Sequence, residues 1–299
     1  AARLSTFSNP PAIRRRLTPS RGAFCARQFT RLGAGSSAPR YSEFMKLTIL
    51  GCSGSLAAPG NPASSYVISN PGETDVIMDF GSGALAAMQT RFDPSNAHVM
   101  FSHLHADHCS DFPSLLVWRR YHPHAPAAGS HRLLGPSYAP EHFGRMGADG
   151  PGQMDDLTDT FEFTAWRDGE AEELSGLKVI PFPVVHPAQE SKALRIENAN
   201  GKVITFSGDS AFTPTLVEAA RGADVFLCEA AWGPTSEGKA PGMHLSGEEA
   251  GRIAREAGVK TLVLVHIQPW SDPEEVLAAA RAEFEGEIVL GKAGATFEV

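Results

Sequence analysis

Histidine and aspartate are concentrated in one short segment of the chain. Residues 102–108 read Ser-His-Leu-His-Ala-Asp-His, which places His103, His105, Asp107 and His108 within six residues. Imidazole nitrogen and carboxylate oxygen are ligands that zinc accepts. Alternate residues of an extended loop can point at one metal ion, and the Asp-His pair that follows can point at a second. The competing interpretation is a polar loop that is rich in histidine by chance, and the density of the pattern argues against it.

Four more candidate residues occur later in the chain, each in a loop or after an apolar segment: His186, Asp209, His244 and His266. In open α/β architectures, ligands bind at the carboxyl ends of strands. Any one of these residues alone is equally compatible with a capped strand end or a surface histidine. Because all four share the same context, we predict that they converge with the first cluster on one two-metal site.

An alternation of strands and helices that begins at Met45 must position these side chains. Strands are predicted at residues 46–50, 65–69, 76–79, 98–101, 177–182, 194–197, 203–206, 225–228, 261–265 and 296–299. Helices are predicted at residues 84–90, 112–121, 213–220 and 273–284, and between Ser246 and Gly258. Ser246 and Glu249 have the spacing of a capping box at the start of that last helix. The pattern is typical of an α/β protein.

The composition narrows the class of protein. Of the 299 residues, 42% are hydrophobic and 20% are charged, which is typical of a soluble globular protein rather than a collagenous or coiled-coil one. No segment reaches the ~18 consecutive apolar residues of a membrane span. The four cysteines (Cys25, Cys52, Cys109 and Cys228) are far apart, which excludes a disulfide framework and favours a reducing compartment. We therefore expect a cytoplasmic protein without membrane contact.

The charge is distributed unevenly along the chain. Residues 1–44 contain eight arginines and one acidic residue, a balance of +7, and are rich in Ser, Pro, Gly and Ala. This composition predicts a disordered basic leader outside the fold, although it also resembles a targeting peptide superficially. Residues 45–299 are predicted to form the folded domain. They contain 18 basic and 33 acidic residues, a balance of −15.

The order of the candidate ligands resembles that of the metallo-β-lactamase superfamily. The motif H-x-H-x-D-H is followed by His186, Asp209 and His266. Glu229-Ala230 and the segment 244–246 (HLS) resemble motifs of the dizinc phosphodiesterase branch that includes ribonuclease Z. Other blocks are similar to bacterial atypical class II cyclic-nucleotide phosphodiesterases, namely residues 51–55 (GCSGS), 118–123 (WRRYHP), 227–230 (LCEA) and 296–299 (TFEV). The resemblance implies a four-layer αββα sandwich with the metal ions at one edge.

The resemblance also implies which residues bind the two divalent ions, for which we expect Zn²⁺, with Mn²⁺ as an alternative. One ion is expected to be bound by His103, His105 and His186. The other is expected to be bound by Asp107, His108 and His266. Asp209 is expected to bridge the two, unlike in the true β-lactamases.

The chemistry expected of such a site is attack on a phosphodiester by a hydroxide that bridges the metal ions. His244 is the candidate general acid for the leaving ribose oxygen, because histidine titrates near neutrality. Glu229 is the candidate that orients its ring, with a capping or salt-bridging acid as the alternative. Asp107 is a candidate acceptor for the proton of the nucleophilic water.

The favoured substrate is a small nucleotide, a 3′,5′-cyclic nucleotide such as cAMP that is converted to a 5′-nucleotide. A ribonuclease Z-like endonuclease that processes the 3′ end of tRNA is the alternative, and a lactonase or an inactive binding protein are two others. The acidic body disfavours tRNA, because tRNA binding requires neutralisation of several phosphates by Lys and Arg. A homodimer is expected, since oligomers are common.

Several other features have structural interpretations. Asp79 is predicted to accept hydrogen bonds from loop amides, and residues 51–55 to form a tight turn rather than a phosphate cradle. Cys109 is predicted to be a packing residue. Residues 118–122 (WRRYH) could recognise a base and a phosphate, although Trp118 on a helix is also a core candidate.

Overall fold

The computed structural model describes residues 44–299, and all of them fall within one unit of the chain. The prediction of a disordered leader therefore concerns residues that, apart from Phe44, lie outside the described part. The division into a leader and a hydrolase domain stays a prediction.

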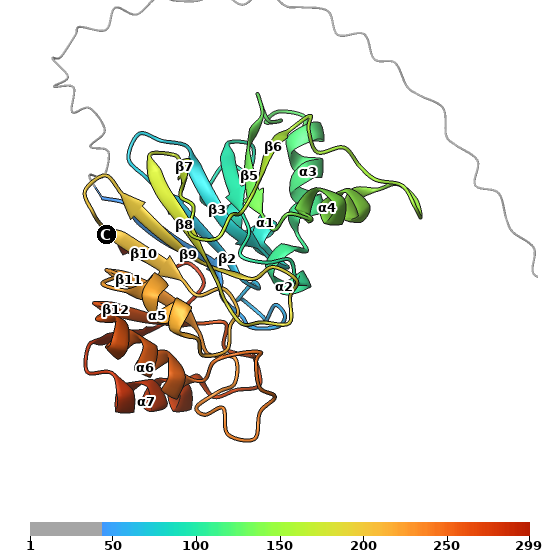
Figure 1. The fold of residues 1–299 in the computed structure, drawn as a ribbon. Coiled ribbons are helices and arrows are strands. Elements are labelled where there is room, and N and C mark those ends of the chain that lie inside the picture. The colour runs from blue at the N-terminus through green and yellow to red at the C-terminus, as the bar shows by residue number, and fades with distance from the viewer. Residues whose placement is uncertain (1–43) are drawn as a thin grey trace, which may run out of the picture. The chain divides into compact units, whose positions relative to one another are not determined.

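Two seven-stranded sheets form the centre of the described unit (Figure 1). The first has the spatial order β14 (Thr296–Glu298), β1 (Lys46–Gly51), β2 (Ser65–Ser69), β3 (Asp75–Phe80), β4 (Ala97–Met100), β5 (His131–Gly135) and β6 (Phe161–Ala165). The second has the order β13 (Glu287–Leu290), β12 (Thr261–Val265), β11 (Val225–Glu229), β10 (Val203–Phe206), β9 (Lys192–Asn198), β8 (Leu177–Pro183) and β7 (Glu172–Leu174). The last strand, β14, thus returns to the first sheet, where it pairs antiparallel to β1.

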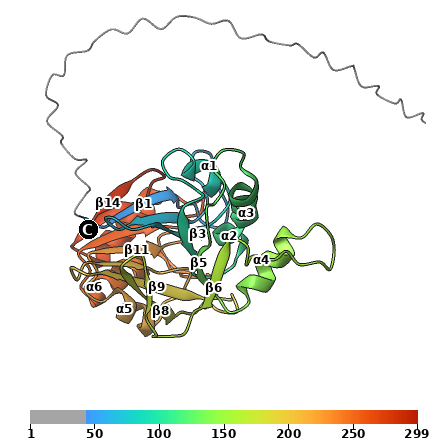
Figure 2. The same cartoon turned by 90° about the horizontal axis from the view of Figure 1, so that it is seen from above.

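Helices cover the outer faces of both sheets, as Figure 2 shows from above. Those beside the first sheet are α1 (Ala84–Met88), α2 (Ala106–Cys109), α3 (Phe112–Tyr121) and α4 (Ala139–Gly147). Those beside the second sheet are α5 (Pro214–Ala220), α6 (Gly247–Ala257) and α7 (Pro273–Glu283). The arrangement is the predicted four-layer αββα sandwich.

Three buried apolar clusters fill the three spaces between these layers. In β11, Val225 and Leu227 belong to the cluster between the sheets, whereas Phe226 and Cys228 belong to the cluster under the helices. This alternation explains why the strand is apolar throughout, since side chains point to opposite faces and both faces are covered.

The parallel strands end at the edge where the candidate residues lie. In the first sheet β3 and β4 are parallel, and in the second sheet β10, β11 and β12 are parallel. Residues 103–108 follow β4, the last three of them in α2, and Asp209 follows β10. Glu229 is the last residue of β11, and His266 directly follows β12. The topology therefore brings residues that are far apart in sequence to one edge.

The sequence predicted most of the strands at this edge and missed several other elements. β5, β6, β7 and β13, as well as α4, were not predicted, and neither was α2, which contains the last residues of the His-rich motif that was expected to be an extended loop. Each of these strands is short, and β7 and β13 are the outermost strands of their sheet, so they carry little hydrophobic alternation. Their formation depends on pairing with a neighbouring strand rather than on local sequence.

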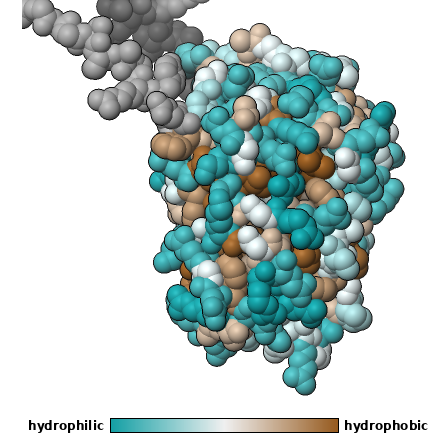
Figure 3. All heavy atoms as spheres, turned by 60° about the vertical axis from the view of Figure 1, so that its left-hand side comes forward, coloured by the Kyte–Doolittle hydropathy of each residue, from teal (hydrophilic) through white to brown (hydrophobic). Residues whose placement is uncertain are grey.

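The surface is largely hydrophilic in the face that Figure 3 shows, where hydrophobic side chains form small, separate patches. Among residues 44–299, no helix combines the length and the hydropathy that a membrane crossing requires. The cytoplasmic location and the homodimer stay predictions.

Candidate functional site

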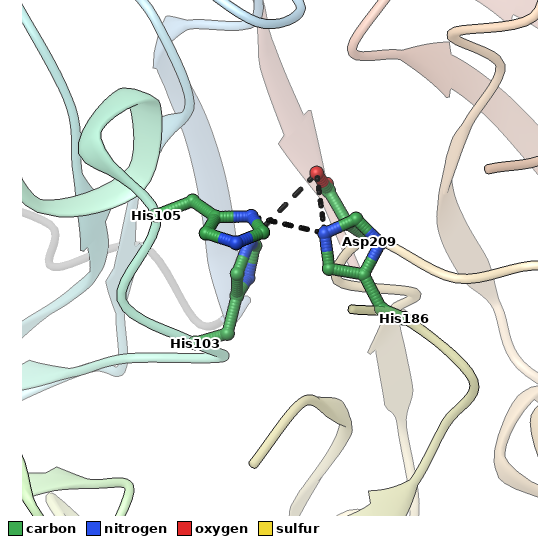
Figure 4. A group of neighbouring side chains, drawn as sticks. All are labelled: His103, His105, His186 and Asp209. Atoms are coloured by element: carbon green, nitrogen blue, oxygen red, sulfur yellow. Dashed lines mark hydrogen bonds and ion pairs between the residues drawn. The ribbon is translucent and has the colours of Figure 1, made fainter. Parts of the chain in front are cut away.

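The first group of possible metal ligands consists of His103, His105, His186 and Asp209, whose donor atoms all lie within 4.8 Å of one another. Figure 4 shows these side chains pointing toward one another from three separate segments. His186 Nε2 lies 3.0 Å from His105 Nδ1 and 3.8 Å from Asp209 Oδ2. His103 Nε2 also lies 3.8 Å from Asp209 Oδ2.

The second group consists of Asp107, His108, His266 and again Asp209. His266 Nε2 is 3.0 Å from Asp107 Oδ2 and 3.3 Å from His108 Nε2. His108 Nε2 is 3.1 Å from Asp209 Oδ1. All seven residues predicted as metal ligands therefore lie together at one edge of the two sheets.

Asp209 belongs to both groups and is 2% exposed. Its Oδ1 is the oxygen nearest His108, whereas its Oδ2 is the oxygen nearest His103 and His186 and also lies 3.5 Å from His266 Nε2. Burial by itself would raise the pKa of this carboxyl, but the surrounding imidazoles, with His108 first among them, hold the pKa well below its usual range. An ionised carboxylate whose oxygens lie beside donor atoms of both groups has the placement that a bridging ligand requires.

Hydrogen bonds orient two of the histidine rings from behind. His108 Nδ1 lies 2.7 Å from Asp79 Oδ2, and His186 Nδ1–H donates to the backbone oxygen of Met243 at 2.6 Å. Each bond uses Nδ1, so Nε2 is the ring nitrogen that faces the site. Asp79 also accepts hydrogen bonds from the backbone N–H and the hydroxyl of Ser102, both at 2.7 Å, which agrees with its predicted role at a strand end.

The donor set fits divalent cations. His108 Nε2 and Asp107 Oδ2 lie 3.3 Å and 3.0 Å from His266 Nε2, which already accepts the N–H of Ser55. His103 Nε2 is buried and has no hydrogen-bond partner. Buried polar atoms that lack hydrogen-bond partners lower the stability of the folded state unless a cation binds them. Imidazole and carboxylate ligands suit Zn²⁺ and similar ions.

The charge of the site leads to the same conclusion. Burial alone would lower the pKa of His108, but Asp209, Asp107 and Asp79 outweigh it and raise that pKa well above its ordinary value. Three carboxylates around one imidazole are an excess of buried negative charge. Bound divalent cations would neutralise this excess.

Close backbone approaches position the two metal-ligand loops. A Cβ atom at Gly81 would lie 2.0 Å from the backbone oxygen of Asp107, and one at Gly54 would lie 2.2 Å from that of His266. Both positions therefore require glycine. Asp79 and His266 each have a φ of 55°, the left-handed region that non-glycine residues seldom adopt. Strained residues of this kind are common at functional sites.

Glu229 and His244 form a pair beside the second group. Glu229 is fully buried, and its Oε1 accepts hydrogen bonds from His244 Nδ1 at 2.9 Å and from the backbone N–H of Ser210 at 2.8 Å. Burial opposes protonation of His244, but the carboxylates of Glu229 and Asp209 outweigh it and raise the pKa of His244 to about 9. With Nδ1 occupied, Nε2 is the nitrogen that can transfer a proton.

The alternative interpretation of Glu229 as a surface acid is wrong, because the side chain is buried and bonded to His244. Glu229, His244 and His266 also lie close enough to form a third possible metal group. The role of His244 as acid rather than ligand therefore stays a prediction.

The segment 118–122 does not offer free cationic groups. Arg119 is 2% exposed, and its guanidinium donates to the hydroxyl of Thr160 at 2.6 Å and to the backbone oxygen of Ser95 at 2.9 Å. Arg120 forms an ion pair with Asp155. Both arginines are used internally, so neither is available to recognise a base or a phosphate.

The structure agrees with two other structural interpretations of the sequence. Cys109 is buried, and burial raises the pKa of its thiol to about 12, as expected for a packing residue. Residues 51–55 form a tight connection against His266 rather than an open phosphate cradle. Sequence reasoning missed Met243, which acts through a backbone oxygen that carries no sequence signal.

A four-layer αββα fold whose sheet edge holds two groups of His and Asp residues defines a class of metal-dependent hydrolases. Comparison with known proteins gives the family, because the model of the beta-lactamase superfamily domain matches residues 74–267. The chain belongs to the metallo-β-lactamase superfamily.

Individual relatives agree with this assignment. The chain is 46% identical over 255 residues to the uncharacterized protein Rv1339 of Mycobacterium tuberculosis, over 85% of this chain and 92% of that protein. It is 25% identical over 255 residues to the probable metallo-hydrolase YhfI of Bacillus subtilis, over 85% and 100% of the two chains.

Two crystal structures show the same fold. That of YhfI matches with a TM-score of 0.76 at 22% identity, over 86% of this chain and 100% of YhfI. That of the short form of human tRNase Z matches with a TM-score of 0.64 at 18% identity, over 85% of this chain and 98% of the human one. At these identities the likeness is one of fold.

Proposed function

We propose that the chain is a metal-dependent phosphodiesterase that hydrolyses 3′,5′-cyclic nucleotides such as cAMP to 5′-nucleotides. The observation that carries this proposal is the bond between Glu229 and His244 beside the candidate metal ligands. Hydrolysis of a phosphodiester expels a ribose alkoxide, which leaves readily only if it is protonated. A histidine held by a buried carboxylate supplies that proton.

The side chains have separate roles in the proposed reaction. Two divalent cations, with Zn²⁺ as the best match and Mn²⁺ as an alternative, would activate a water molecule and neutralise phosphoryl oxygens when bound. Water attacks phosphorus, the bond from phosphorus to O3′ breaks, and His244 Nε2 delivers its proton to O3′. Asp107 accepts the proton of the water, and Glu229 holds the ring of His244 through Nδ1.

The charge distribution supports a small substrate. Of the 18 Lys and Arg residues in residues 45–299, twelve form ion pairs with Asp or Glu. Few cationic side chains of the described residues are therefore free to follow a nucleic-acid backbone. Binding of tRNA requires several such contacts, whereas a cyclic nucleotide carries a single phosphate.

A ribonuclease Z-like endonuclease is the second candidate, because it would break the same type of bond with the same residues. A side-by-side assay separates the two, with 3′,5′-cyclic AMP and a tRNA precursor offered to the metal-loaded full chain. We expect release of 5′-AMP and no cleavage of the precursor, with Asp209→Ala as the inactive control. Cleavage of the precursor without turnover of cyclic AMP would establish the second candidate instead.

A further inference from the structure

We infer that Trp232, Val185 and Lys239 form the subsite that receives the nucleoside part of the substrate. The inference rests on the proposed phosphodiesterase function, and it assigns substrate recognition to the loop between β11 and α6 together with Val185 of the loop between β8 and β9. Three observations support it, namely the place of the indole, the environment of the indole and the character of the surrounding rim.

The indole of Trp232 lies directly beside the proposed proton donor. The centroid of its ring system is 5.0 Å from that of His244, and the two planes meet at 86°. The backbone N–H of Trp232 donates to the backbone oxygen of Leu245, the residue after His244, at 2.9 Å. The loop therefore holds Trp232 and His244 together.

Trp232 is not a core residue. It is half-buried, and it belongs to none of the three apolar clusters that fill the sandwich. Its indole N–H makes no hydrogen bond to the described residues. A tryptophan with an accessible ring and a free N–H at a site edge is suited to contact a ligand that is partly aromatic and partly polar.

The other two residues of the proposed subsite are apolar (Val185) and cationic (Lys239). Val185 is 46% exposed and directly precedes His186, and a Cβ atom at Gly242 would lie 3.8 Å from its Cγ1. Lys239 Nζ lies 5.8 Å from the centroid of the Trp232 ring and forms no ion pair with the described residues. An aromatic base attached to an anionic phosphate fits such a rim.

The proposed chemistry gives the same placement. His244 protonates O3′, which is an oxygen of the ribose, so the group beyond that oxygen is the nucleoside. Because Trp232 packs against His244, its ring is the aromatic surface next to the leaving oxygen. Trp232 is therefore expected to contact the base and to contribute to specificity rather than to the chemical step.

The test compares two substrates that differ only in the base, namely cyclic AMP and ribose 3′,5′-cyclic phosphate. In Trp232→Ala, kcat/KM for cyclic AMP should fall by about 5- to 150-fold, the range that loss of one base–aromatic stack produces. For the substrate without a base it should change less than about twofold, since no stack is lost. Trp232→Phe should restore most of the loss, because it keeps an aromatic face.

Trp270→Ala is the matched control. Trp270 is 66% exposed, and its Nε1–H donates a hydrogen bond to Gln268. Its loop lies beside that of Trp232, since a Cβ atom at Gly233 would be 3.9 Å from Ser271 Oγ. This variant should keep both activities. An equal loss on both substrates in Trp232→Ala, or a base-dependent loss in Trp270→Ala instead, would overturn the subsite.

Calorimetric titration of the metal-loaded protein with 5′-AMP separates this inference from the proposed function. If the wild-type protein hydrolyses neither cyclic phosphate, the proposed function is wrong. The affinity for 5′-AMP then tests the subsite independently of turnover. Weaker binding of 5′-AMP in Trp232→Ala than in the wild type supports the subsite, and unchanged binding contradicts it.

Discussion

Two clusters of histidines and charged residues lie near the two ends of β4, and they differ in how their polar atoms are paired. Beyond its carboxyl end, His103 has a buried ring nitrogen without a partner, and His108 Nε2 and His266 Nε2 face each other at 3.3 Å. Near its amino end, Arg119 and His131 satisfy each other, since Arg119 Nη2 donates to His131 Nδ1 at 2.7 Å.

The second cluster is completed by ordinary hydrogen bonds. His131 Nε2 lies 3.1 Å from Asn96 Oδ1, and the remaining guanidinium nitrogens of Arg119 donate to Thr160 and Ser95. A cluster whose polar atoms are paired stabilises the fold, whereas one with unpaired acceptors aimed at a common point is built for a ligand. The comparison shows that composition alone does not distinguish a structural cluster from a functional one.

The largest effect is expected from Asp209→Ala. This change removes the carboxylate shared by both ligand groups, so kcat/KM should fall by at least about 10³-fold, since metal stabilisation of the transition state is worth several kcal/mol. Metal content, measured by elemental analysis, should fall as well. Asp159→Ala, at an exposed ion pair with Arg120, is the control and should keep both. Full activity in Asp209→Ala would show that the proposed metal site is not required for catalysis.

The next largest effect is expected from His244→Ala. Turnover should fall by about 10²- to 10⁴-fold, because a general acid is lost, while the metal content stays at its wild-type value. The measurement is a steady-state assay together with elemental analysis of the same preparation. Loss of metal in this variant would show that His244 is a ligand, as the third possible metal group allows.

The pH dependence sharpens the role of Glu229. The pKa of His244 is raised to about 9, so its acid form is present below that pH and is lost as the pH rises through it. In Glu229→Gln the hydrogen bond to a carboxylate is lost, and the alkaline limb of kcat should move from about 9 toward the ordinary histidine pKa of about 6.5. If the alkaline limb of kcat did not move in Glu229→Gln, the Glu229–His244 pair would not take part in the proton transfer.

The structural cluster should respond in stability and not in activity. Arg119→Met leaves buried acceptors at Ser95 and Thr160 without a donor, which should lower the free energy of unfolding by about 2–3 kcal/mol. Urea denaturation measures this change. The metal content and the activity per folded molecule should stay at wild-type values, and a selective loss of metal would contradict the distinction between the two clusters.

The sequence predicted the candidate site better than it predicted the periphery of the fold. The seven proposed ligands were found because each follows an apolar strand or falls in a dense motif, and parallel strands bring their ends to one edge. Asp79 was predicted as a strand-end acid, but its bond to His108 depends on a left-handed backbone that the sequence does not reveal.

Tertiary contacts explain what the sequence missed. Arg119 could be interpreted as a phosphate-binding residue, because nothing local shows that the hydroxyl of Thr160, 41 positions later, accepts a hydrogen bond from its Nε–H. Trp232 shows no periodicity that separates a rim residue from a core residue. The roles of Arg119 and Trp232 can be recognised only from their tertiary contacts, which are set by the packing of distant segments.

The metal content of the purified full chain tests the central claim most directly. Elemental analysis after removal of loosely bound ions should find close to two divalent ions per chain in the active wild-type protein. An active protein with no bound metal, or with metal that persists unchanged in Asp209→Ala, would contradict the account.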